Sequence, residues 1–254
     1  MKKNVITLGL LALCVSIAHA QILDINSYVK SKIEIYNNEN DVDVIEKLHK
    51  ELTNLRNHEG NYEEEVFLTL ENLIVTDIAD LAPDTNESKK QVYLLLSEQN
   101  KKNTSYMDGK KLKKLDSAYL TSIADLKCRF IDYLAKQENY EESMFAEDLY
   151  KQAIKNDKKN TLAYIGYGTW LYFAPPIVGG GIDSCHEKFT QAVDKAQSPN
   201  LKYLALLYYS QSLFALGEYD LYEEALDEAY SIIGKDGMIE SMRELNEKDL
   251  LFFE

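Results

Sequence analysis

Residues 146–153 read AEDLYKQA, residues 185–192 read CHEKFTQA, and residues 225–232 read ALDEAYSI. Each segment starts 39 or 40 residues after the previous one and carries packing residues at positions i, i+4 and i+7. Residues at this spacing share one face of a helix, and small residues there let a neighbouring helix come close. A fixed period of this length indicates stacked helical hairpins. The expected packing residues are Ala146, Tyr150 and Ala153, then Cys185, Phe189 and Ala192, then Ala225, Ala229 and Ile232.

Helical periodicity extends over the rest of the chain, and no segment alternates as a β-strand does. We therefore predict an all-α fold of stacked antiparallel helical hairpins. Six lysines lie between residues 101 and 114; we interpret this run as a solvated link between two lobes, with a docking patch for an acidic partner as the alternative. The expected organisation is an N-terminal helical lobe over 21–105, a repeat array over 106–236, and a capping helix over 237–254 that covers the last repeat.

Further residues precede the second and third of these triplets. Tyr164, Tyr167, Gly168 and Leu171 fit a W-xx-LG-xx-Y pattern with tyrosines in the tryptophan and leucine places, and Gly217 and Tyr219 fit a turn between helices. Together with the A-xxx-F-xx-A spacing of Ala146, Tyr150 and Ala153, these residues resemble the tetratricopeptide repeat. The period departs from that family's 34 residues, and no proline closes the second helix. The resemblance implies a helical superhelix with a concave binding surface.

The N-terminus has the features of a secretory signal peptide. Two lysines precede an apolar region over residues 5–17, and residues 18–20 form a small-x-small cleavage site. We therefore expect residues 1–20 to be removed after Ala20 and the protein to be exported to the periplasm. Lipid modification of Cys14 is not favoured, because the preceding residue, Leu13, is not small. The apolar region is too short to span a bilayer.

The charge of the chain excludes some partners. Its 42 acidic and 28 basic residues give a formal net charge of −14 at pH 7. Such a chain repels nucleic-acid phosphates and anionic lipid surfaces, so neither class of partner is expected.

Catalytic and cofactor motifs are missing from the sequence. It contains no H-E-x-x-H, G-x-S-x-G or C-x-x-C pattern. Cys185 and His186 are neighbours, and neighbouring side chains on a helix point about 100° apart, which suits a nucleophile–base pair poorly. We predict a protein that is not an enzyme, with no cofactor and no metal site.

The stretch APPIVGGG at residues 174–181 separates the two helices of the middle hairpin. Glycines before a helix are able to cradle a phosphate, but Asp183 would compete for the same helix dipole, and we interpret the stretch as a flexible loop. A proline followed by glycines, and then Glu187, Phe189 and Ala192, resembles the TPR-like exported proteins associated with TRAP transporters, the T component. That resemblance implies a solute-handling accessory of a transport system.

The eighteen tyrosines suggest an aromatic concave surface. We predict a non-catalytic adaptor that binds an unidentified protein or peptide there; the alternative is a periplasmic accessory that binds a small apolar or carboxylate solute. An open groove would favour the peptide, and an enclosed pocket around Trp170, Tyr167 and Phe214 would favour the solute. The tetratricopeptide register predicts these groove residues: Leu162, Ile165, Thr169, Tyr172, Leu207, Gln211 and Phe214.

Overall fold

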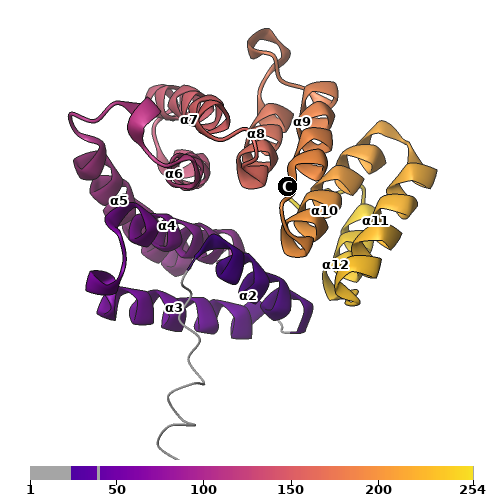
Figure 1. The fold of residues 1–254 in the computed structure, drawn as a ribbon, viewed down its shortest axis with the longest axis horizontal. Coiled ribbons are helices and arrows are strands. Elements are labelled where there is room, and N and C mark those ends of the chain that lie inside the picture. Colours follow the sequence, from indigo (N-terminus) through magenta and orange to yellow (C-terminus); the bar gives the residue numbers. More distant parts are fainter. Residues whose placement is uncertain (1–23, 39–40, 254) are drawn as a thin grey trace, which may run out of the picture.

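The computed structural model describes residues 24–38 and 41–253. Within them the chain forms eleven α-helices and no strand, which confirms the predicted all-α class. Figure 1 shows the helices arranged around a common centre. Their bounds are α2 Ile25–Asn38, α3 Asp41–Asn57, α4 Glu64–Leu81, α5 Asn86–Met107, α6 Ser117–Phe130, α7 Lys136–Asn156, α8 Thr161–Phe173, α9 Ile182–Lys195, α10 Pro199–Leu216, α11 Tyr219–Ile233 and α12 Gly237–Asn246.

Three helix pairs carry the repeated pattern. The pairs α6–α7, α8–α9 and α10–α11 pack most extensively, and the second helix of each holds one triplet. Eight of the nine expected packing residues are buried, and Ile232 is half-buried. Gly168 on α8 shows how closely these helices approach, because a Cβ there would lie 2.5 Å from Cε1 of Phe189.

Local signals in the sequence set the ends of these helices. The side chains of Asp116, Asn160 and Ser198 accept hydrogen bonds from backbone N–H groups in the first turns of α6, α8 and α10. Gly217 and Gly234 end α10 and α11 in the left-handed conformation that favours glycine. The loop after α8 contains a 3₁₀ turn at Pro176–Val178 and returns to α8 where the N–H of Gly181 donates to the Leu171 carbonyl.

The N-terminal helices share a core with the repeat array. Helix α5 continues through residue 105, where we expected the first lobe to end, to Met107, and α4 packs against α6. A buried network joins α4, α5 and α6: Asn72 donates to Ser122 at 2.9 Å and accepts from Gln99 and Asn103, both at 2.8 Å. Because buried amides need such partners, this network fixes the helices against one another.

The two ends of the described chain meet. Helix α2 packs against α10 and α12 (Figure 1). The N–H of Met238 donates to Oδ1 of Asn37 at 3.1 Å, and Gly237 passes so close to that turn that a Cβ would lie 2.7 Å from the Asn37 carbonyl oxygen. The helices therefore form a closed arrangement around the centre.

The C-terminal region is only partly the helix that we expected over 237–254. Helix α12 ends at Asn246, and residues 250–253, here called the tail, turn inward to lie beside α10, where Figure 1 marks the C-terminus. Leu251 and Phe253 of the tail are buried against Cys185 and Phe189. The apolar tail is thus packed inside the repeat array.

Two expectations concern membranes and export. Among the described helices, none combines the length and apolarity needed to cross a bilayer. The expected signal peptide, residues 1–20, lies outside the described residues.

Candidate functional site

A cavity of about 650 Å³ lies at the centre of the closed arrangement, and we call it the central cavity. This volume is within the range typical of small-molecule sites. Helices α2, α4, α6, α7, α8 and α10 contribute to its lining, together with the loop after α8 and the tail. The residues that line it include Tyr28, Lys32, Leu73, Thr76, Asp77, Asp80, Asp125, Cys128, Arg129, Asp132, Met144, Tyr150, Leu162, Ile165, Gly166, Thr169, Trp170, Phe173, Leu204, Tyr208 and Phe253.

Two ion pairs lie in the wall of the central cavity. Nζ of Lys32 lies 2.5 Å from Oδ1 of Asp77, whose side chain is almost fully buried and also accepts a hydrogen bond from the Tyr28 hydroxyl. Arg129 on α6 pairs with Asp80 on α4. Each pair joins helices that are distant in sequence, so the charges also connect the elements that surround the cavity. Each cation is thereby matched by a carboxylate.

Asp125 is a carboxylate of the cavity lining that takes part in neither ion pair. Its Oδ1 accepts a hydrogen bond of 2.6 Å from the Tyr150 hydroxyl, and within the described part of the chain no ion pair reaches it. Burial raises the pKa of Asp125 to about 6, although the Tyr150 hydroxyl and the charge of Arg129 oppose that shift. Gly166 makes room for this group, because a Cβ there would lie 2.6 Å from Asp125 Oδ1 and 2.5 Å from Tyr150 Cε1.

Thr76 adds a second polar group without a protein partner. It is 8% exposed and lines the cavity, and its hydroxyl makes no hydrogen bond to any described residue. Buried hydroxyl groups nearly always have a partner, so an unmatched one beside a cavity points to a bound water or ligand.

Aromatic and aliphatic side chains form the remaining wall of the cavity. The indole N–H of Trp170 lies 3.1 Å from both the Ser143 carbonyl oxygen and Oγ, which fixes the ring. Phe253 of the tail stacks against Tyr208, with the ring centroids 5.8 Å apart. Leu73, Met144, Leu162, Ile165, Phe173 and Leu204 complete the apolar part of the lining.

The predicted groove residues fall into two groups. Leu162, Ile165 and Thr169 on α8 line the central cavity. Tyr172 and Phe214 instead pack against the cluster that contains the tail, while Leu207 and Gln211 are fully buried.

The predicted groove residues that do not line the cavity lie where the tail packs. Gln211 Oε1 accepts hydrogen bonds from the Phe252 N–H at 3.2 Å and from the Asn246 side chain at 3.0 Å. The ring of Tyr172 lies edge-on to Phe253, at 5.3 Å between centroids. The α10 part of the expected groove is therefore the seat of the chain's own tail. Of the aromatic residues expected to surround an enclosed pocket, Trp170 lines the cavity, whereas Tyr167 and Phe214 do not.

The charged residues of the cavity were not among the residues predicted from the sequence. Asp77 lies in the strongly apolar helix α4, between the core residues Ile74 and Ile78, and such a charge was an available signal because buried charges need partners or mark a functional site. Asp125 gave no such signal, because it shares its face of α6 with Thr121, Ser122 and Arg129. Which helices supply those partners depends on the tertiary fold.

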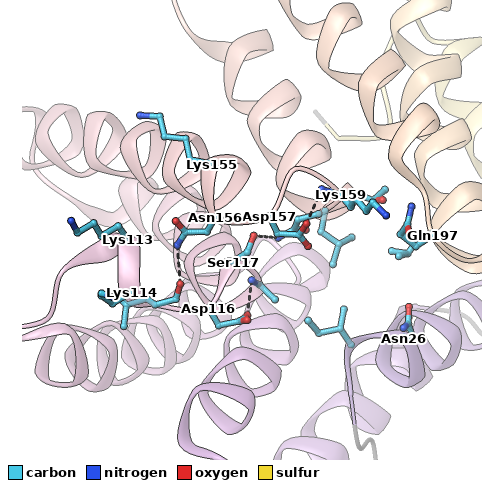
Figure 2. Close-up of a pocket in the computed structure, with 17 residues that line it drawn as sticks. Asn26, Lys113, Lys114, Asp116, Ser117, Lys155, Asn156, Asp157, Lys159 and Gln197 are labelled. Carbon is cyan, nitrogen blue, oxygen red and sulfur yellow. Dashed lines mark hydrogen bonds between the residues drawn. The ribbon is translucent and has the colours of Figure 1, made fainter.

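A second hollow, of about 820 Å³, is more open and lies where the loop before α6 meets the turn between α7 and α8 (Figure 2). Lys113, Lys114, Lys155 and Lys159 are among its lining residues, so part of the predicted basic run borders it. Two of its polar side chains bond within the protein: Asn156 donates to the Leu115 carbonyl at 2.8 Å, and Asn160 donates to Ser117 Oγ at 2.8 Å. Thr161 also lines it, and the Thr161 hydroxyl is buried with no partner among the described residues.

The described residues offer little for covalent chemistry. Cys128 and Cys185 are free thiols, and burial raises the pKa of each to about 12. His186 Nδ1 lies 2.9 Å from Ser212 Oγ, but Ser212 is fully buried and donates to the Tyr209 carbonyl, so no substrate can reach it. No group of three or more potential ligands in the described part of the chain is arranged to hold a metal ion.

No protein-family model matches the chain, and no curated protein matches it. Membership of the tetratricopeptide family, and the resemblance to the TRAP-associated T component, therefore remain predictions.

Proposed function

We propose that the protein is a binding protein for a small amphipathic molecule, which it holds in the central cavity. The observation that carries this proposal is the cavity itself, about 650 Å³ at the meeting point of six helices, with apolar side chains and a few polar groups in its lining. Sites of this composition are typical of small-molecule binding. The proposal follows the alternative drawn from the sequence, a solute-binding accessory, and export to the periplasm remains an expectation.

The tail supports this function over an open peptide groove. Phe253 lines the cavity, and residues 250–253 cover the α10 surface that an extended peptide would need. Removal of the tail would expose buried aromatic surface, at a cost of about 25 cal/mol for each Å². A small molecule is accommodated without that rearrangement.

Native mass spectrometry tests the proposal. The protein is incubated with an extract of the cells that produce it, desalted, and analysed with its non-covalent ligands retained. We expect a small-molecule adduct that is lost in Thr169→Trp, because Thr169 lines the cavity and an indole there would fill it. Thr190→Trp is the matched control: both hydroxyls donate to the carbonyl four residues earlier, and Thr190 does not line the cavity. An adduct of equal occupancy in parent and Thr169→Trp would refute this site.

A peptide-binding adaptor is the second candidate, because the contacts of the tail show how the α10 surface would hold a peptide once the tail is displaced. The Phe252 N–H bonds to Gln211, and the rings of Phe252 and Phe253 pack on Tyr208, much as a bound peptide would. A variant that ends at Glu247 should then bind a synthetic peptide of residues 248–254 supplied separately, measured by fluorescence anisotropy. Absence of binding to the folded variant would rule out the α10 surface as a peptide groove.

A further inference from the structure

The charges that line the central cavity do not balance. Lys32 and Arg129 are its two cations, and both are paired, with Asp77 and Asp80. Asp125 then remains inside the cavity, and Asp132 adds a further carboxylate at its exposed rim. With every group ionised, the lining carries an excess of negative charge. A ligand that brings a positive charge would reduce this excess.

Asp125 is well placed to receive such a charge. It uses one carboxylate oxygen to accept the Tyr150 hydroxyl, and an ionised carboxylate has further lone pairs to offer. Partial burial makes its interaction with a ligand charge stronger than on the surface, since the effective dielectric constant is lower there. An ammonium group would supply both the charge and N–H donors.

Thr76 is an independent sign that a polar ligand group is missing. Thr76 lines the cavity, and its hydroxyl is buried and has no partner in the described protein. A hydroxyl accepts as well as donates, so it is able to accept one N–H of an ammonium group. Asp125 on α6 and Thr76 on α4 are therefore both able to accept a hydrogen bond from a ligand donor.

The aromatic side chains of the lining suit the apolar body of such a molecule. Trp170, Phe173 and Tyr208 contribute aromatic rings, and the faces of aromatic rings attract organic cations. A carboxylate ligand, the kind considered from the sequence alone, would meet the excess negative charge of the lining.

We propose that the central cavity binds an organic ammonium ion, with its charged group against Asp125 and Thr76 and its apolar body along the aromatic wall. This inference rests on the proposed small-molecule function and specifies the ligand class. The ammonium group belongs either to a free amine or to a lysine side chain of a short peptide.

The binding should depend on pH. The titratable groups around Asp125 are Arg129 and Cys128 on its own helix, Lys32 on α2, Asp80 on α4, Tyr150 on α7 and Tyr208 on α10. Burial raises the pKa of Asp125 to about 6, so the carboxyl group is largely neutral at pH 5 and ionised at pH 7. The ammonium ion needs the ionised form, and its affinity should rise between these two pH values.

The single tryptophan of the chain makes a direct assay available, because Trp170 lines the cavity. Its fluorescence, excited at a wavelength that tyrosine does not absorb, is titrated with three matched probes: 4-phenylbutylamine, 4-phenylbutan-1-ol and 4-phenylbutyrate. They share an apolar body and differ in charge. We expect the amine to bind roughly tenfold or more tightly than the other two at pH 7. An acetylated, amidated Leu-Lys-Leu peptide forms the second arm, and tighter binding than the amine would identify a peptide as the source.

Two variants locate the charge. Asp125→Asn should weaken amine binding by roughly tenfold or more and leave binding of the alcohol unchanged. Asp148→Asn, on an exposed position of α7 that does not line the cavity, is the matched control. The pH dependence of the parent protein gives the same information without any substitution.

The outcomes separate this inference from the proposed function. Equal affinity for amine and alcohol, or preference for the carboxylate, would overturn the ammonium assignment while leaving a small-molecule site in place. Amine affinity that is unchanged in Asp125→Asn and constant between pH 5 and pH 7 would also overturn it. If no probe changes Trp170 fluorescence, this ligand class is wrong, and the adduct in the extract experiment decides the function.

Discussion

Gly166 on α8 lies so close to two residues of the cavity lining that a single added methyl group should disturb their packing. A Cβ built there would lie 2.5 Å from Cε1 of Tyr150 and 2.6 Å from Oδ1 of Asp125. Carbon atoms in contact are normally about 3.5–4.0 Å apart, so Gly166→Ala forces an overlap of roughly 1 Å. Tyr150 is only 2% exposed, and its hydroxyl is held by Asp125, so the ring has little freedom to move.

The magnitude follows from two opposing effects. Alanine is favoured over glycine inside a helix by about 1 kcal/mol. Overpacking of a rigid site usually costs about 1–3 kcal/mol, and we expect the upper part of that range, about 2–3 kcal/mol, because both Tyr150 and Asp125 must shift. We expect Gly166→Ala to lower the free energy of unfolding by about 1–2 kcal/mol, which corresponds to a fall in Tm of roughly 2–8 °C for a chain of this size.

Urea denaturation followed by circular dichroism measures this change, with thermal melting in parallel. Gly60→Ala is the matched control, because a Cβ at Gly60 meets no atom within 4 Å. Its stability should remain within about 0.5 kcal/mol of the parent. A Gly166→Ala protein as stable as the parent, or more stable, would refute the close packing of α8 on Tyr150 and Asp125.

Three further predictions concern the charge, packing and thiols of the protein. Burial raises the pKa of Asp125 from 3.8 to about 6, so its ionised form opposes folding. Asp125→Asn should therefore raise the free energy of unfolding by about 1–3 kcal/mol at pH 7, and the gain should disappear by pH 4; a gain that is equal at both pH values would contradict this cause. Ala192 is fully buried, and Ala192→Leu should cost about 1–3 kcal/mol by overpacking, a prediction that fails if the variant melts with the parent. Because burial raises the pKa of Cys128 and Cys185 to about 12, neither thiol should react with Ellman's reagent at pH 8 unless the protein is unfolded first.

The parts of the fold that follow from local periodicity were predictable. The spacing of Ala146, Tyr150 and Ala153 identifies the buried face of α7, and the structure buries all three. Capping residues and glycines fixed helix ends in the same way, because their effect extends over only a few residues.

Contacts between distant segments were not predictable from these patterns. The apolar residues 250–253 suggested a helix that covers the end of the array, but the segment turns inward because Gln211 offers an acceptor to Phe252 beside an apolar cluster. Of the expected groove residues, only Leu162, Ile165 and Thr169 on α8 line the cavity, because the tail covers the rest of the predicted surface. The pairing of Lys32 with Asp77 joins residues 45 positions apart, and no periodic signal extends over that distance.

A crystal structure of the protein after incubation with an extract of its own cells tests the central claim most directly. The account predicts electron density for a small non-protein molecule in the central cavity, with a nitrogen atom beside Asp125 and an apolar part along Trp170. A cavity that contains only ordered water, or one that is closed by its own side chains, would contradict the claim that this is the binding site.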